Sequence, residues 1–267
     1  MRKILTSLIT LLFVSSLTTP AEGSGSTVNL GLASITTPNS VCEVQGQGTS
    51  SDRYKVRNAD EFQEVFSGDC TGNTGGVRHI EMLQSIDVTG GGELNDENDF
   101  GSINFSLVGN NNRLVLNQNI PFKKSIFSGT SFSLSDLIIE IPYDLSTPLI
   151  LQGGSSQDVV WENVHFVLSG NSINPGGDLI SVPGGVFTVE NSSITQSSTA
   201  SSTLTSVFLP GTSSSDITIS NFSVELGNVS TPDPFSFWGG TGSLAATTLS
   251  ATGVKFSVNS ISAERFS

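Results

Sequence analysis

Two aspartates are the first candidates for catalytic chemistry. Asp158 and Asp216 each lie five residues before an asparagine, Asn163 and Asn221, so they occupy equivalent places in a repeated pattern. Two carboxylates that face one water molecule are what an inverting glycoside hydrolase requires. Recurrence at equivalent places is also what a structural turn residue shows, and the pattern favours this structural interpretation.

An acidic segment, "ELNDENDFG" at residues 93–101, offers oxygen ligands for a metal ion. Glu93, Asp96 and Asp99 could hold calcium, because calcium binds hard oxygen ligands supplied by loops. The spacing differs from that of an EF-hand, since Phe100 stands where a ligand is needed. An ordinary acidic surface loop is the simpler interpretation, and apart from calcium here no cofactor is expected.

The histidines and cationic residues form no recognisable catalytic set. His79 and His165 are the only histidines, too few for a His-rich metal site, and both read as half-exposed strand residues. Arg113, Lys123 and Lys124 are the cationic candidates for the base of a lyase. The two lysines read equally well as a solvated turn.

Four aromatic residues could stack on sugar rings: Trp161, Trp238, Phe237 and Tyr143. Phe237 and Trp238 adjoin a Gly-Gly turn, where outward exposure is plausible. Inward packing is the commoner fate of such large side chains. Both a sugar-binding surface and core packing therefore stay open for these residues.

These candidates are distributed over an internal repeat. The template is apolar, any, apolar, any, Asn, any, any, apolar, and its copies are "FSLSDLII" at Phe132, "VVWENVHF" at Val159, "FTVENSSI" at Phe187, "ITISNFSV" at Ile217 and "LSATGVKF" at Leu249. An incomplete copy, "FSLVGNNN", begins at Phe105. The turn positions are then Gly109, Asp136, Asn163, Asn191, Asn221 and Gly253, spaced 27 to 32 residues apart.

A repeat of about 28 residues with an apolar period of two predicts an all-β solenoid. Each coil would supply three short strands that stack on the next coil about 4.8 Å away. Asn, Asp and Gly tolerate left-handed backbone at a sharp turn, and stacked Asn amides can bond between coils. Asp136, Asn163, Asn191 and Asn221 are therefore predicted to form a structural turn ladder.

The segment "VRNADEFQEVFSG" predicts a short capping helix before the coils. Asn58 is the expected N-cap and Glu61 its capping-box partner, with Phe62, Val65 and Phe66 on one face. Solenoids need such a cap because an uncovered end exposes strand edges and core to water.

Cys42 and Cys70 are the only cysteines. In an exported protein such a pair is expected to form a disulfide, although two separate buried thiols are the alternative. Their spacing fits no metal site, since no second Cys or His pair accompanies them.

The first residues predict export. Arg2 and Lys3 precede an apolar run that ends near small residues, which is typical of a signal peptide over residues 1–21. An N-terminal extension at 22–53 and a β-helix domain at 54–267 would follow, with no transmembrane anchor after signal removal. Cleavage leaves nine basic against 24 acidic residues, a net charge of about −15. Nucleic acid is thus an unlikely partner.

The pattern resembles the right-handed single-stranded parallel β-helix of the pectin-lyase-like superfamily. The resemblance covers the cap helix, then "VRHIEMLQSIDVTGGGEL", then "INFSLVGNNNRLVL", then the coils. "DVVWENVHF" at 158–166 is similar to the Val-Trp-Ile-Asp-His segment of pectate lyases but has Glu162 and Asn163 where that segment has Asp-His. The carboxylate and arginine marks of lyases and the aspartate marks of polygalacturonases have no counterpart.

The composition and acidity are also similar to those of autotransporter passengers and other surface adhesins. We therefore expect a secreted or cell-surface, non-catalytic protein that binds an extracellular glycan or a host or cell-surface ligand. A diverged polysaccharide lyase or glycoside hydrolase acting on acidic polysaccharide is the first alternative, with Asp136, Asp158 and Asp178 lining one groove. A structural envelope component is the second.

Overall fold

Short strands with apolar residues at every second position make up most of the described residues in this computed structural model. The structure describes residues 42–67, 70, 76–88, 104–116, 131–144, 158–182, 185–210, 215–231, 236–238 and 248–263. The predicted signal peptide and most of the predicted extension lie outside these residues. In β2, buried Arg78, Ile80 and Met82 alternate with half-exposed residues, because successive side chains of a strand point to opposite faces.

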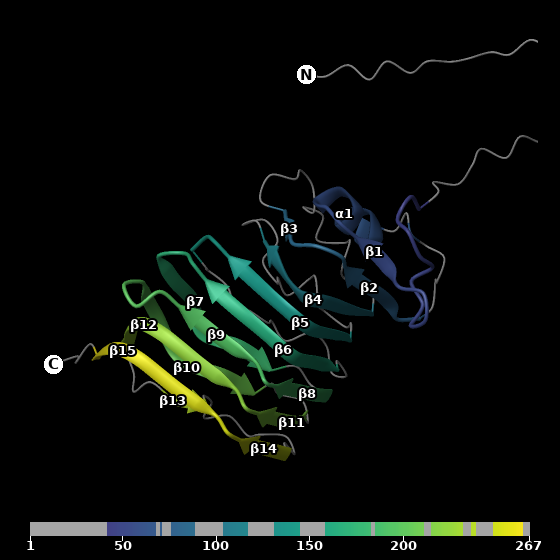
Figure 1. Ribbon diagram of the computed structural model, residues 1–267. Coiled ribbons are helices and arrows are strands. Elements are labelled where there is room, and N and C mark those ends of the chain that lie inside the picture. Colours follow the sequence, from purple (N-terminus) through teal and green to yellow (C-terminus); the bar gives the residue numbers. More distant parts are fainter. Residues whose placement is uncertain are drawn as a thin grey trace, which may run out of the picture. The chain divides into compact units, whose positions relative to one another are not determined.

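The strands form three parallel stacks (Figure 1). The first stack contains β1 (Tyr54–Val56), β2 (Arg78–Met82), the first halves of β4 (Phe105–Val115), β5 (Phe132–Ile141) and β6 (Val159–Leu168), then β8 (Gly185–Glu190), β11 (Ser215–Ser220) and β14 (Thr248–Thr252). The second contains β3 (Ile86–Asp87), the second halves of β4 to β6, β9 (Ser193–Gln196), β12 (Ser223–Thr231) and β15 (Lys255–Ala263). The third contains β7 (Ser172–Val182), β10 (Ser201–Pro210) and β13 (Ser236–Trp238). The ends of β12 and β15 continue into this third stack, because Asn228 pairs with both Ser201 and Ser260.

The register of the first stack follows the sequence repeat. Phe132 pairs with Val159, Val159 with Phe187, Phe187 with Ile217, and Ile217 with Leu249. Each pairing joins the first apolar residue of one template copy to that of the next. The predicted all-β parallel solenoid with coils of about 28 residues is thus confirmed.

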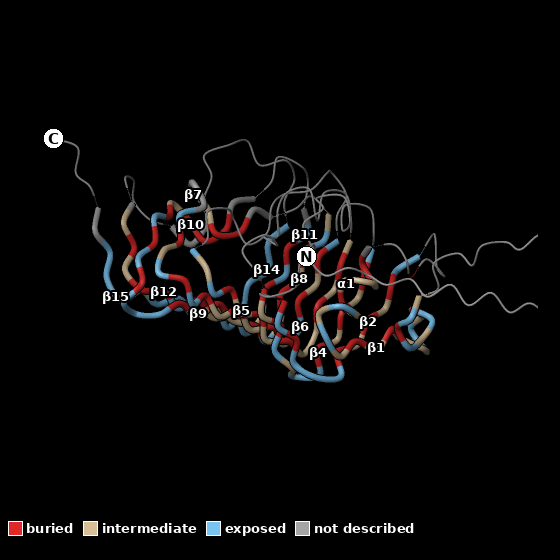
Figure 2. Tube along the Cα trace, turned by 90° about the horizontal axis from the view of Figure 1, so that it is seen from above, coloured by how far each residue is buried: buried red, intermediate tan, exposed pale blue. Residues whose placement is uncertain are grey.

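The core is a set of apolar columns that run through the coils (Figure 2). Phe105 and Phe132 stack with ring centroids 5.4 Å apart, and Phe66 of the helix packs edge-on against Phe105 at 5.3 Å. Further along, Phe187 lies 5.7 Å from Trp161 and 6.2 Å from Phe208. Because each coil buries its apolar residues against its neighbours, the stack rather than the single coil is the stable unit.

The turns between the first and second stacks have left-handed backbone at the predicted positions. Asp136, Asn163, Asn191 and Asn221 have φ between 48° and 56°. Asn163 Nδ2 donates to Asp136 Oδ1 at 2.8 Å, and Asn221 Nδ2 donates to Asn191 Oδ1 at 3.0 Å. These side chains therefore bond successive coils to each other, and Asn and Asp also tolerate the left-handed backbone of the turn.

The earliest copy departs from the prediction. Gly109 was expected at its turn, but the left-handed residues are Asn110 and Asn111, with φ of 52° and 60°. The pairing of β4 with β5 shifts register between Val108 and Asn112, as at a β-bulge. Gly109 is still required, because a Cβ there would lie 2.5 Å from the Asp136 carbonyl oxygen.

Helix α1 (Ala59–Ser67) covers the first coil. Asn58 Oδ1 accepts the N–H of Glu61 at 2.8 Å, as expected for an N-cap, while the Glu61 carboxylate accepts the N–H of Arg57 at 2.6 Å. Phe62, Val65 and Phe66 are buried among the core residues. The helix thus closes the apolar columns at this end.

Among the described residues, no helix has the length and apolar character needed to cross a bilayer.

Candidate functional site

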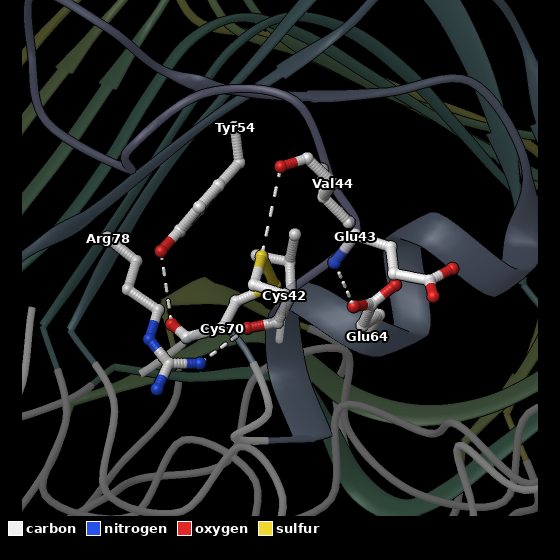
Figure 3. Close-up of a disulfide and its surroundings, with 8 residues drawn as sticks. Cys42, Glu43, Val44, Tyr54, Glu64, Cys70 and Arg78 are labelled. Carbon is white, nitrogen blue, oxygen red and sulfur yellow. Dashed lines mark hydrogen bonds between the residues drawn. A yellow bond between two sulfur atoms is a disulfide. The ribbon is translucent and has the colours of Figure 1, made fainter. Parts of the chain in front are cut away.

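The disulfide region contains several polar contacts that lie close together (Figure 3). Cys42 and Cys70 form a disulfide with Cα atoms 4.5 Å apart. The Tyr54 hydroxyl donates to the Cys70 carbonyl oxygen at 3.1 Å, and the Glu64 carboxylate accepts the N–H of Glu43 at 2.6 Å. These contacts tie the segment before the coils to α1.

Arg78 is a charged residue of this region that the sequence did not single out. It begins the inward column that continues with Phe105 and Phe132, and it is buried. Its Nη1 donates to the Val65 carbonyl in the last turn of α1, where carbonyl groups lack helical partners. Burial lowers the pKa of the Arg78 guanidinium from its usual value. Its role is to close the C-terminal turn of the helix.

The same region contains the one group of potential metal ligands found among the described residues. Ligand atoms of Cys42, Glu64 and Cys70 lie within 4.8 Å of one another. Both sulfurs are consumed by the disulfide, and a metal needs thiolate rather than disulfide sulfur. The group is therefore structural. The predicted calcium ligands Glu93, Asp96 and Asp99 lie outside the described residues.

The suspected catalytic aspartates are engaged between coils. The Asp136 carboxylate accepts from Asn163, and Asp158 Oδ1 accepts the N–H of Val186 at 3.0 Å. The Asp178 carboxylate accepts from the hydroxyls of Thr205 and Ser206. Each of these three carboxylates thus receives hydrogen bonds from the next coil along the chain.

Asp158 belongs to a column of polar residues that precede the strands of the first stack. Asn104 Oδ1 accepts the N–H of Ser131 at 2.8 Å, and Ser131 Oγ accepts the N–H of Asp158 at 3.0 Å. With the Asp158 to Val186 bond, three bonds of the same kind join four successive coils. Asn104, Ser131 and Asp158 are spaced 27 residues apart, and this spacing is the signal in the sequence that could have identified the column.

The aspartates also lie at different positions along the strands or on different coils. Asp158 is level with Ser131, five residues from Asp136, so those two carboxylates are about 16 Å apart along the strand direction. Asp158 and Asp216 lie two coils apart, about 10 Å, with exposed Val186 on the coil between them. The first separation is too large for two carboxylates to act on one water, and in the second pair Val186 lies on the coil between the two aspartates, so the arrangement fits the structural interpretation.

The histidines have separate environments. His165 contacts Ser193 Oγ at 2.9 Å and Asn163 Oδ1 at 3.2 Å, so it supports the turn ladder. For His79, burial and, secondly, the charge of Arg53 lower the pKa of the imidazole from its usual value. Arg113 forms an ion pair with Glu140. Lys123 and Lys124 lie outside the described residues.

Trp161 is not available to stack on a sugar, so of the two interpretations that its sequence left open, its burial supports core packing. Its side chain is 0% exposed and packs 4.8 Å from Phe166 and 5.7 Å from Phe187. It is the third residue of its template copy and therefore points inward, in register with Leu134 and Val189. The tryptophan fills the core instead.

The other predicted aromatic residues give no exposed platform within the described chain. Tyr143 is partly buried against the core, and this burial raises the pKa of its phenol to about 12. Phe237 and Trp238 belong to β13, where the backbone of Trp238 pairs with Phe208. Their side chains are outside the described part of the structure.

The outer face of the first stack presents a row of small polar residues. The row runs in register through Ser106, Ser133, Val160, Thr188, Thr218 and Ser250, so one valine interrupts five hydroxyls. A second outward row contains Val108, Ser135, Glu162, Glu190, Ser220 and Thr252. We name these two rows the hydroxyl face. Its side chains repeat at the coil spacing of about 4.8 Å.

The chemistry of the hydroxyl face is hydrogen bonding rather than acid–base catalysis. Serine and threonine hydroxyls both donate and accept, so they can exchange bound water for the hydroxyls of a ligand. A parallel solenoid hosts many activities, so the fold by itself names none. Comparison with known proteins adds no relative, because no family model, no curated protein and no solved structure matches this chain.

Proposed function

We propose that the protein is secreted and non-catalytic, and that it binds an extracellular glycan through the hydroxyl face. The observation that carries this proposal is the in-register row of hydroxyls from Ser106 to Ser250 on the outer face of the first stack. A regular row suits a polymer that repeats its own hydroxyls. Many weak, equivalent contacts then combine by multivalency.

The charge of the chain supports a neutral glycan. The full sequence has a net charge of −13, and Glu162 and Glu190 stand beside each other on the hydroxyl face. An anionic polysaccharide would be repelled by this field. This argues against the alternative of a lyase or hydrolase on acidic polysaccharide, whose binding groove needs positive charge.

The engagement of the aspartates also supports a binding role. Asp136, Asp158 and Asp178 all accept hydrogen bonds from the next coil. A general acid or base must exchange its proton with substrate, which such bonds oppose. The resemblance to the pectin-lyase-like superfamily, whose lyases and polygalacturonases act on polysaccharides, supports a carbohydrate as the ligand.

The direct test is glycan binding by the chain without residues 1–21. Wild-type protein is applied to an array of neutral and acidic glycans, and binding to neutral polymers is expected. The double variant Thr188→Ala, Thr218→Ala should lower the apparent affinity at least tenfold, because two neighbouring hydroxyls of the face are lost. Thr195→Ala, a hydroxyl on the outer side of β9 in the second stack, is the matched control and should bind normally.

Two results would contradict the proposal. Release of unsaturated oligouronides from polygalacturonate or alginate would show a lyase. Equal loss of binding in the Thr195→Ala control would place the ligand elsewhere on the molecule.

A further inference from the structure

The C-terminal coil has an open edge. β14 pairs with β11, and β15 pairs with β12, and within the described residues neither strand has a partner on its other side. The two strands run over five and nine residues. Unpaired N–H and C=O groups along such an edge are a template for another chain.

Apolar residues of the core columns are exposed at this edge. Leu249, in register with Ile217, is 48% exposed, and Ile261, in register with Val229, is 56% exposed. Ile217 and Val229, one coil earlier, are each 1% exposed. Figure 2 shows β14 and β15 in the colour of exposed residues, beside the red of the preceding coils. The columns therefore continue to the surface uncovered.

The charge of this coil differs from that of the coils before it. Thr248–Ala263 contains one charged residue, Lys255, and no carboxylate. The preceding coil carries Asp216 and Glu225, and the chain as a whole is strongly acidic. Depletion of charge marks the centre of protein interfaces, and edges that stay free are usually protected by several charges. The residues of β14 and β15 themselves therefore bring no carboxylate to a contact between two acidic chains.

Within the described residues, α1 covers the core columns at the opposite end and Gln45 pairs with Lys55 of β1, so no matching edge is seen there. A head-to-tail contact would need such an edge, whereas a tail-to-tail contact uses the same surface twice. We propose that the C-terminal coil docks on the C-terminal coil of a second copy of this chain, forming a two-fold dimer. Leu249 and Ile261 of each copy cover those of the other.

The size of the surface sets the expected strength. β14 and β15 together supply 14 residues, against roughly 20–30 residues on each side of a standard interface. The dimer is therefore at the small end of the range, with a dissociation constant on the order of micromolar.

Sedimentation of the chain without residues 1–21, from about 1 to about 100 μM, tests the dimer. The average mass should rise from one chain to two and stop there. Leu249→Lys and Ile261→Lys should each raise the dissociation constant at least tenfold, because a buried unpaired ammonium group is costly. Val186→Lys is the matched control, since Val186 is 41% exposed on the outer side of the first stack. It should dimerise like wild type.

Hydrogen exchange of the wild-type protein gives a second readout that needs no variant. Amides of β14 and β15 should become more protected as the concentration rises, while those of β1 and β2 should not change. A single-chain mass at 100 μM, growth beyond two chains, or equal weakening by Val186→Lys would each overturn the proposal. So would exchange at β14 and β15 that is independent of concentration.

Discussion

The two ends of the solenoid differ in how their apolar core is covered. At the N-terminal end, α1, the Cys42–Cys70 disulfide and buried Arg78 cover the first coil. At the C-terminal end, Leu249 and Ile261 continue the core columns into solvent. A repeat protein must cover both ends of its core. The contrast shows that capping is a local addition to the repeat and not a property of the coil itself.

Replacement of a phenylalanine by alanine at each end should give the largest difference in the free energy of unfolding between the two ends. Phe66→Ala removes a ring buried between Phe62 and Phe105 and should lower the free energy of unfolding by about 3–5 kcal/mol. Phe256→Ala, at a position that is 36% exposed, should cost less than about 1 kcal/mol. Urea denaturation followed by circular dichroism, at a concentration that keeps the protein monomeric, measures both. Equal losses would show that the ends are equally well packed.

Removal of the disulfide should have the next largest effect. The variant Cys42→Ala, Cys70→Ala releases a crosslink between residues 28 apart in sequence and should cost about 3 kcal/mol. Thermal denaturation should then show a melting temperature lower by roughly 6–12 °C. Reductant should lower the melting temperature of wild type to a similar degree and leave the variant unchanged. The disulfide is expected to stabilise mainly the N-terminal end. Amide hydrogen exchange in the variant that becomes faster at β15 as much as at β1 would contradict this expectation.

The smallest expected effect is the pH dependence of His79. Its pKa in the folded protein lies below the unfolded value of about 6.5, because burial and the charge of Arg53 disfavour the imidazolium form. The unfolded chain therefore binds the proton more readily. The contribution of His79 is full above about pH 6.5 and is lost as the pH falls through the folded pKa.

Nuclear magnetic resonance titration of the imidazole protons measures the pKa of His79 directly. The variant His79→Gln should flatten the dependence of unfolding free energy on pH below about 6.5. A measured pKa at or above 6.5 would contradict the argument.

The fold was predictable because its signal is periodic. The template copies from Phe132 to Leu249 place apolar residues two apart and repeat them at the coil length, and the registers of the first stack follow from that alignment. The left-handed φ at Asn191 and Asn221 was predictable for the same reason, since few residue types tolerate it. The bulge at Asn110 and Asn111 adds residues without changing the apolar pattern, so the turn of that copy was predicted at Gly109 instead.

The environment of single residues was less predictable. Trp161 and Phe237 looked alike as aromatic candidates, yet the position of Trp161 in the template already required it to point inward. Arg78 occupies a column otherwise made of apolar residues, and only the neighbouring end of α1 explains its charge there. The placement of Arg78 depends on a contact between segments that no local pattern records.

The column of Asn104, Ser131 and Asp158 has a consequence for how such a chain can change in length. Each side chain accepts a backbone N–H from the coil that follows it, 27 residues later for Asn104 and Ser131. Duplication or deletion of a 27-residue coil within this column would therefore keep the accepting side chain and the donating N–H in register at the new junction, whereas a shorter insertion within a strand would break the register. The molecule can gain or lose length in units of one coil while both of its ends stay as they are.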